Sequence, residues 1–193
     1  MKILICGDSF SADWTVKYQG IGWPNMLAND YQVTNLSQAG CGEYKIYLQL
    51  LSVDINDFDV IVMSHTSPNR IYIQQHPVHA SDPLHKNSDL IYTDLKDHAK
   101  KNKSLQPIIE FYENYFEIGY AEFMHTLICE KIQDHLNKFK GKTLHIANVD
   151  WKNLYQFDDM LNFEHLFKSN HGLMNHFNDK GNTIIYNKIK SLL

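Results

Sequence analysis

Short hydrophobic runs that end in polar or glycine-rich turns recur along this chain, and this is the pattern of buried β-strands. The runs cover residues 1–6, 31–36, 58–63 and 143–149. The run at 58–63 is the clearest of them and is typical of a parallel sheet covered on both faces. We therefore predict that these four segments are strands of one sheet.

Apolar residues at helical spacing separate these runs. We predict helices over residues 23–29, 43–51, 107–138 and 178–193. Within 43–51 the expected apolar face consists of Tyr44, Tyr47, Leu48 and Leu51. The long segment is expected to break near Gly119, and Asn178 is a candidate cap of the last helix. Strands that alternate with helices predict an α/β fold, a three-layer α/β/α sandwich with a mainly parallel sheet, in one domain over residues 1–193.

Between about residues 70 and 106 this periodicity disappears. The segment is polar, rich in histidine and interrupted by proline. A long irregular segment inside a compact domain is usually a lid, a binding loop or an insertion. We therefore expect a polar insertion or lid at this place.

Composition and charge exclude several classes of protein. The chain has 193 residues, of which 44% are hydrophobic and 21% charged, as in a globular domain. Its net charge of -4 and the lack of a basic stripe argue against nucleic acid and acidic membranes as partners. No run approaches the roughly 18 apolar residues of a membrane span, so no membrane partner is expected.

The cysteines and the first residues indicate a reducing compartment. Cys6, Cys41 and Cys129 lie far apart, and none belongs to a CxxC pair that would indicate a zinc or redox site. The few apolar residues between Lys2 and Gly7 are too short a run for a signal peptide. We therefore expect a cytoplasmic protein.

A candidate nucleophile follows the first predicted strand. The sequence Gly7-Asp8-Ser9 reads as a strand-to-helix turn, and ligands of open α/β sheets bind outside the carboxyl ends of the strands. A serine at this position suits nucleophilic catalysis. Alternatively, Ser9 caps the following helix and Gly7 relieves a tight turn.

Three further features complete a possible acyl-transfer site. His176, shortly before the last helix, could take the proton of Ser9. The backbone N–H groups of Ser9 and Gly40 could stabilise the oxyanion. A side chain from the segment after the 58–63 strand would supply the third donor.

In order and spacing, these motifs resemble the SGNH hydrolases, also called GDSL-type esterases and lipases. The matching blocks are Gly7-Asp8-Ser9-Phe10-Ser11, Asn35-Leu36-Ser37-Gln38-Ala39-Gly40 and His176-Phe177-Asn178-Asp179-Lys180-Gly181-Asn182. The resemblance implies a flavodoxin-like sheet and a serine esterase that forms an acyl-enzyme on Ser9 and needs no cofactor. It also implies small acyl substrates such as O-acetyl esters of carbohydrate.

The chain departs from the family in the third block. There the family usually carries Gly-x-Asn-Asp, whose Asn side chain contributes to the oxyanion hole. This chain has Ser64-His65-Thr66-Ser67-Pro68-Asn69 instead. Strict spacing puts Thr66 at the Asn position, whereas a longer loop would let Asn69 reach inward. We favour Asn69, because an amide N–H is the better donor. Arg70 could anchor this loop or bind an anionic group.

A second departure concerns the catalytic acid. The family usually has an Asp three residues before the histidine, but Leu173 occupies that position here. Asp150 is our candidate replacement, with Asp158, Asp159 and Glu164 as further possibilities. The alternative function is therefore a catalytically impaired binding or accessory module that recognises a saccharide or a protein. A nucleotide-binding flavodoxin-like or Rossmann-like protein is a third possibility, disfavoured because no GxGxxG follows the first strand.

The 11 histidines raise the question of a metal site. His76, His79 and His85 lie within the polar segment, but Pro77 disrupts helical spacing between the first two. No carboxylate cluster accompanies them in the sequence. We therefore expect no bound metal.

Overall fold

A parallel sheet of five strands forms the centre of the protein. A computed structural model describes residues 1–148, 155–158, 160–172 and 176–193. The strands are β1 (Lys2–Gly7), β2 (Gln32–Asn35), β3 (Val60–His65), β6 (Lys142–Ala147) and β7 (Met160–Asn162). Their order is β2-β1-β3-β6-β7, and every neighbouring pair is parallel. The four predicted strands are all present, and β7 is a fifth that the sequence pattern did not reveal.

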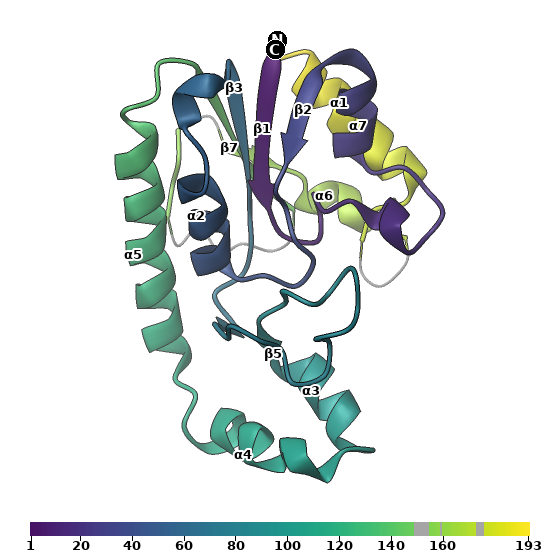
Figure 1. Cartoon of the computed structure of the whole chain (residues 1–193), viewed down its shortest axis with the longest axis vertical. Coiled ribbons are helices and arrows are strands. Elements are labelled where there is room, and N and C mark those ends of the chain that lie inside the picture. Colours follow the sequence, from purple (N-terminus) through teal and green to yellow (C-terminus); the bar gives the residue numbers. More distant parts are fainter. Residues whose placement is uncertain (149–154, 159, 173–175) are drawn as a thin grey trace.

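Helices cover both faces of this sheet, as the three-layer prediction requires. They include η1 (Trp14–Val16), α1 (Trp23–Asp30), α2 (Glu43–Leu51), η2 (Ile55–Asp57), α5 (Ile118–Leu136), α6 (Glu164–Phe167) and α7 (Asp179–Lys190). In Figure 1, α2 and α5 lie on one side of the strands and α1 and α7 on the other. The structure is therefore an α/β sandwich of flavodoxin-like layering.

Alternation along the strands divides the core between the two faces. Ile3 and Ile5 pack with residues of α1 and α7, whereas Leu4 and Cys6 pack with residues of α2 and α5. All four side chains are fully buried. Successive residues of a strand point to opposite faces, so an apolar strand is expected where both faces are covered.

The segment between β3 and α5 forms a small subdomain rather than an irregular loop. It contains β4 (Arg70–Ile71), β5 (Leu90–Ile91), α3 (Tyr92–Ala99), η3 (Lys103–Leu105) and α4 (Gln106–Asn114). It has its own apolar cluster, which includes Leu90, Leu95, Leu105, Ile109 and Tyr112. In Figure 1 this part lies beyond the end of the sheet where the strands finish.

One helix prediction is confirmed and another needs correction. The predicted helical segment 107–138 breaks near Gly119, as expected, into α4 and α5, which residues 115–117 separate. The α2 face formed by Tyr44, Leu48 and Leu51 is at least 37% exposed, whereas Ile46 and Leu50 are fully buried. The Tyr44 ring instead meets Tyr72 edge to face, so these apolar residues line the surface near the polar segment.

Among the described residues, no helix has both the length and the apolar character needed to cross a membrane.

Candidate functional site

The strand order places a crevice at the carboxyl ends of β1 and β3. In doubly wound sheets of this order, ligands bind at the topological switch point between β1 and β3. There the connections that follow the two strands run to opposite sides of the sheet. Gly7 pairs with Ser64 in this register. A Cβ on Gly7 would come within 2.6 Å of the Ser64 Cβ, so glycine permits the close approach of the two strands at the entrance to the turn.

Asp8 holds the turn in which Ser9 lies. Its carboxylate accepts a hydrogen bond from the Phe10 N–H at 3.0 Å, and its carbonyl accepts one from the Ser11 N–H at 3.1 Å. Asp8 is 1% exposed and Ser9 7% exposed. The turn therefore holds Ser9 nearly buried after β1, while Asp8 is used in contacts with the turn backbone and with Arg70.

Ser9 and His176 line the same pocket, although they come from opposite ends of the chain. The pocket has a volume of about 250 Å³, and Phe10, Trp14 and Asn182 also line it. Its walls come from the β1 turn, the η1 segment and the entrance to α7. The structure thus brings together the two residues that the sequence predicts as nucleophile and base.

Two aromatic rings flank the imidazole of His176. The Phe10 ring centroid lies 4.7 Å from that of His176, and the Trp14 centroid lies 4.4 Å from it. The Trp14 indole N–H also donates to the Ser9 carbonyl at 2.6 Å. Trp14 therefore couples the backbone of Ser9 to the position of the His176 ring.

The start of α7 fixes the chain that carries His176. Asn178 caps the helix, as predicted, because its side-chain oxygen accepts from the Gly181 N–H at 3.0 Å. The His176 carbonyl accepts from the Gly172 N–H at 2.6 Å. A helix cap and a short backbone bridge thus hold the histidine at the pocket wall.

Of the predicted oxyanion donors, Ser9 is the one found among the described residues that line this pocket. Gly40 has φ +77° in a buried turn, Thr66 is 2% exposed, and Asn69 is exposed. Asn69 lines a separate pocket with Tyr92. Of these three residues, none is among the described residues that line the Ser9 pocket.

The candidate acids are only partly described. Asp150, Asp159 and Leu173 lie outside the described residues. Asp158 is exposed, and Glu164 begins the short helix α6. The identity of a carboxylate behind His176 therefore stays a prediction.

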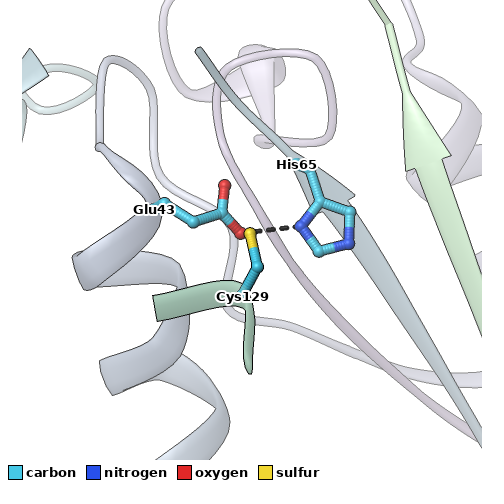
Figure 2. A group of neighbouring side chains, drawn as sticks. All are labelled: Glu43, His65 and Cys129. Carbon is cyan, nitrogen blue, oxygen red and sulfur yellow. Dashed lines mark hydrogen bonds and ion pairs between the residues drawn. The ribbon is translucent and has the colours of Figure 1, made fainter. Parts of the chain in front are cut away.

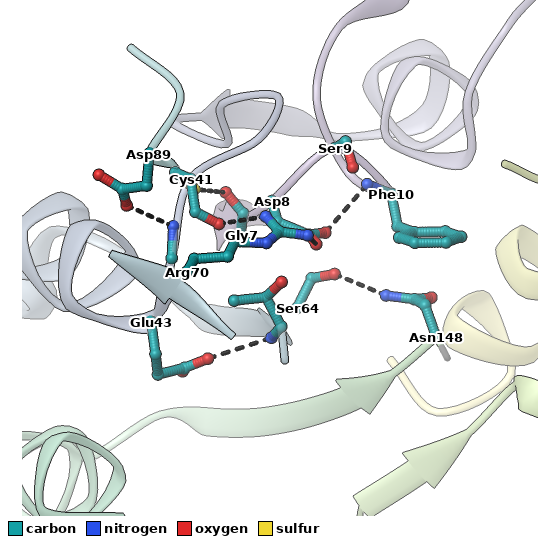
Figure 3. Close-up of polar contacts among 12 residues, drawn as sticks. Gly7, Asp8, Ser9, Phe10, Cys41, Glu43, Ser64, Arg70, Asp89 and Asn148 are labelled. Atoms are coloured by element: carbon teal, nitrogen blue, oxygen red, sulfur yellow. Dashed lines mark hydrogen bonds and ion pairs between the residues drawn. The ribbon is translucent and has the colours of Figure 1, made fainter. Parts of the chain in front are cut away.

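Arg70 ties the two glycine-containing turns together. Its guanidinium donates to the Cys41 carbonyl and, at 3.2 Å, to the Asp8 carboxylate (Figure 3). Of the two roles that the sequence left open for Arg70, the structure supports the anchor. The Gln49 side chain adds a second link, since it accepts from the Gly7 N–H at 2.8 Å and donates to the Gly7 carbonyl at 3.1 Å.

A buried polar network beside the crevice was not foreseen from the sequence. The Glu43 carboxylate, 4% exposed, accepts from Nδ1 of His65 at 2.7 Å and from the Thr66 N–H at 3.1 Å. Nε2 of His65 lies 2.9 Å from Nδ1 of His145. Nε2 of His125 donates to the Thr66 carbonyl at 2.9 Å and lies 3.5 Å from Glu43. This network joins α2, β3, β6 and α5.

The network carries charge within the core. Burial acts to raise the pKa of Glu43, but the facing imidazoles of His65 and His125 outweigh burial and hold the pKa well below its ordinary value. Burial acts to lower the pKa of His125, but the Glu43 carboxylate raises it above its ordinary value. Burial lowers the pKa of His145 to about 2. Glu43 and His125 therefore form an ion pair next to a neutral His145.

Glu43, His65 and Cys129 each place one possible metal-ligand atom within 4.8 Å of the others (Figure 2). However, burial raises the pKa of the Cys129 thiol far above its ordinary value, and metals bind the thiolate. The Glu43 carboxylate is already occupied by three hydrogen-bonding or charged neighbours. We interpret this trio as a hydrogen-bonded part of the core.

Asn148 is a further residue that sequence reasoning missed. It follows β6, is 1% exposed, and donates from Nδ2 to the Ser64 hydroxyl at 2.8 Å (Figure 3). Its buried side-chain oxygen has no hydrogen-bond partner among the described residues. Its position at the carboxyl end of a strand is the signal that could have drawn attention to it.

A larger groove of about 810 Å³ lies between α2, the polar segment and α5. Its aromatic lining includes Tyr44, Tyr72, Phe111, Tyr115 and Tyr120. Neither Ser9 nor His176 lines this groove. Two neighbouring aromatic residues of α4 differ in burial, because Tyr112 is buried whereas Phe111 is 45% exposed.

Comparisons of the chain with models of known protein families and with curated protein sequences find no match. The resemblance to SGNH hydrolases therefore rests on the sequence motifs alone.

Proposed function

We propose that the protein is a serine esterase of the SGNH type, with Ser9 as nucleophile and His176 as general base. The observation that carries the proposal is their meeting in one pocket at the carboxyl edge of the parallel sheet. The resemblance to that family and a cytoplasmic setting belong to the same proposal. Three buried cysteines without disulfides are compatible with such a setting.

In the proposed reaction, His176 takes the proton of the Ser9 hydroxyl as the oxygen attacks an ester carbonyl. The C–O bond to the alcohol then breaks, and His176 returns the proton to the leaving alcohol. Water, deprotonated by His176, next attacks the acyl-enzyme and releases the acid and free Ser9. The backbone N–H groups of Ser9 and Gly40, with Asn69 or Thr66, are the proposed oxyanion donors.

The dimensions of the pocket favour a small acyl group. Pockets for drug-sized ligands typically measure about 300–1,000 Å³, and this one measures about 250 Å³. The proposed substrates are therefore short acyl esters, including O-acetyl groups on a saccharide. No cofactor takes part in this proposed chemistry.

The alternative is a binding or accessory module that has lost efficient catalysis. It is favoured by the positions of Gly40, Thr66 and Asn69 away from the lining of the Ser9 pocket. Such a module would bind a saccharide or protein ligand without cleaving it. The two functions differ in whether hydrolysis depends on Ser9.

Hydrolysis of short p-nitrophenyl esters by matched serine variants tests the proposal. Ser9→Ala should lower kcat/KM at least about 10³-fold, because loss of a nucleophile removes the covalent route. Ser191→Ala, at an exposed serine at the end of α7, should retain full activity. Equal activity of both variants would eliminate Ser9 as the nucleophile, and inactive wild-type protein would favour the binding module.

A further inference from the structure

Histidines of the polar segment surround one carboxylate, a grouping that lies outside the Ser9 pocket. Nε2 of His79 lies 3.0 Å from Oδ2 of Asp94, and Nε2 of His98 lies 3.6 Å from Oδ1. The rings of His79 and His98 meet edge to face with centroids 5.2 Å apart. Two imidazoles therefore converge on Asp94 from different parts of the chain.

The distances from His79 and His98 to the Asp94 carboxylate are close to those between neighbouring ligand atoms of a small metal ion. Zinc binds imidazole nitrogen and carboxylate oxygen at about 2.0–2.2 Å with tetrahedral geometry, which places neighbouring ligand atoms about 3.3 Å apart. The two distances to Asp94, 3.0 and 3.6 Å, lie on either side of this value. Asp94 and His98 are four residues apart on α3 and so lie on the same helix face.

His76 supplies an independent observation that points to the same place. It is 1% exposed, and its Nδ1 accepts hydrogen bonds from the Val78 and His79 N–H groups at 3.2 and 3.1 Å. A neutral imidazole that accepts at Nδ1 carries its proton on Nε2. That buried Nε2 lies 4.0 Å from Oδ2 of Asp94 and has no hydrogen-bond partner among the described residues.

The tautomer decides what His76 can do. Its Nδ1 lone pair is already used by the turn, and its Nε2 bears the proton, so neither nitrogen is free to bind a metal. Outer partners that donate an N–H to a ligand carboxylate orient that ligand, and the His76 Nε2 lies 4.0 Å from the Asp94 carboxylate, near enough to do so after a small shift.

We propose that His79, Asp94 and His98 bind a divalent transition-metal ion such as Zn²⁺, with His76 orienting the Asp94 carboxylate. Three protein ligands leave one position of a tetrahedral ion for water. Asp94 and His98 are also partly exposed, which gives the ion a path of entry. This site is independent of the proposed esterase reaction.

The fold brings the histidines and a carboxylate together in a way that their sequence positions do not indicate. Pro77 does prevent a shared helix for His76 and His79, but a tight turn brings His79 to α3 instead. A carboxylate does accompany the histidines, because Asp94 folds back onto them from 15 residues further along the chain.

The expected role of the ion is to stabilise the polar segment, which contacts Trp14 at the wall of the Ser9 pocket. Lys17 and Asp82 form an ion pair at 2.6 Å between the loop after η1 and this segment. The His85 ring meets Trp14 at 6.1 Å, and Trp14 in turn packs on His176. A metal that joins the turn at 76–79 to α3 would stabilise the surroundings of these contacts.

Cobalt and zinc binding to tag-free, chelator-treated protein test the proposal. We expect one Co²⁺ per chain with visible d–d bands, displacement by Zn²⁺, and a rise of the thermal unfolding midpoint with Zn²⁺. His79→Ala and Asp94→Asn should each remove stoichiometric binding. His165→Ala, at an exposed histidine on α6, is the matched control and should bind as the wild type does.

The role of His76 has its own readout. His76→Gln should keep one Co²⁺ per chain but weaken binding about 10–100-fold, as loss of an outer partner does. Complete loss of binding in this variant, with an unchanged unfolding midpoint in chelator, would make His76 a ligand and contradict its assigned role.

Two other outcomes would overturn the site. The first is wild-type protein that binds no stoichiometric Co²⁺ or Zn²⁺, or that binds it equally well after His79→Ala and Asp94→Asn. The second is a near-ultraviolet thiolate-to-cobalt charge-transfer band that disappears in Cys129→Ser, which would place the ion at the core trio of Glu43, His65 and Cys129.

Discussion

Polar residues near the carboxyl edge of the sheet differ in how well the sequence predicts their contacts. The functional pairing of Ser9 with His176 is predicted from motif and order, because each residue adjoins a recognisable turn or helix start. Glu43 is different. The sequence predicts only that it begins a helix, yet its carboxylate is buried against His65 and Thr66, which follow 22 and 23 positions later. Sequence spacing carries no signal for such a contact.

The Glu43 ion pair predicts a pH-dependent stability. Glu43→Gln should lower the free energy of unfolding by roughly 3 kcal/mol near pH 6, because it leaves His125 buried without its counter-charge. The folded-state pKa of Glu43 is depressed, so its contribution is present above the ordinary value of 4.5 and disappears as the pH falls below it. The folded-state pKa of His125 is raised, so its contribution is present below 6.5 and disappears as the pH rises through the raised value.

Urea denaturation of wild-type and Glu43→Gln protein across the pH range checks this prediction. The difference in unfolding free energy should be largest between about pH 4.5 and 6.5 and should shrink on both sides, on the alkaline side as the pH rises through the raised pKa of His125. Glu110→Gln, at an exposed position on α4, should change stability by no more than about 0.5 kcal/mol at any pH. A pH-independent difference for Glu43→Gln would contradict the ion pair.

Helices and strands were predicted well where one pattern dominates. β1, β2, β3, β6 and α7 were all anticipated, and so was the cap at Asn178. The prediction of the buried face of α2 was wrong because the helix buries Glu43 and Gln49 in polar contacts. Tyr44 and Leu48 therefore lie towards the surface. The strand β7 has three residues, too few for a periodic signal.

The turn between β2 and α2 depends on a glycine. Gly40 has φ +77°, and a Cβ there would lie 2.6 Å from the Ser88 Cβ. Gly40→Ala should therefore lower the free energy of unfolding by about 2 kcal/mol or more, through backbone strain and this overlap. Thermal and urea unfolding measure the change.

Gly119 provides the matched comparison for Gly40. It lies in the first turn of α5, and a Cβ there would meet nothing within 4 Å. Gly119→Ala should leave stability unchanged or raise it by up to about 1 kcal/mol, because alanine favours helix. Adding Ser88→Gly to Gly40→Ala should recover part of the loss. Similar effects of the two alanine substitutions would show that the Gly40 conformation is not required.

At the scale of the whole molecule, the sequence predicted the class of fold but not the organisation of its polar segment. Alternating strands and helices suffice for a layered α/β sandwich, because each element must bury its apolar face. The segment from Arg70 to Leu105 gave no periodic signal, yet it forms a two-stranded sheet, a helix and an apolar cluster of its own. Contacts such as Tyr112 with the Leu90 carbonyl at 2.7 Å hold it together over long sequence separations.

The proposed site likewise depends on the whole molecule. Ser9 and His176 meet because β1 lies between β2 and β3 in the sheet and α7 returns to pack beside α1 (Figure 1). Trp14, which no motif singled out, then contacts both residues. A sequence motif can therefore nominate the residues, but the topology and one aromatic side chain position them.

Covalent labelling with a fluorophosphonate, followed by mass spectrometry of the peptides, tests the central claim most directly. The account predicts a single adduct on Ser9 that is absent from Ser9→Ala, much slower in His176→Gln and unchanged in Ser191→Ala. Folded wild-type protein that remains unlabelled, or that is labelled at another residue, would contradict the assignment of Ser9 as an activated nucleophile.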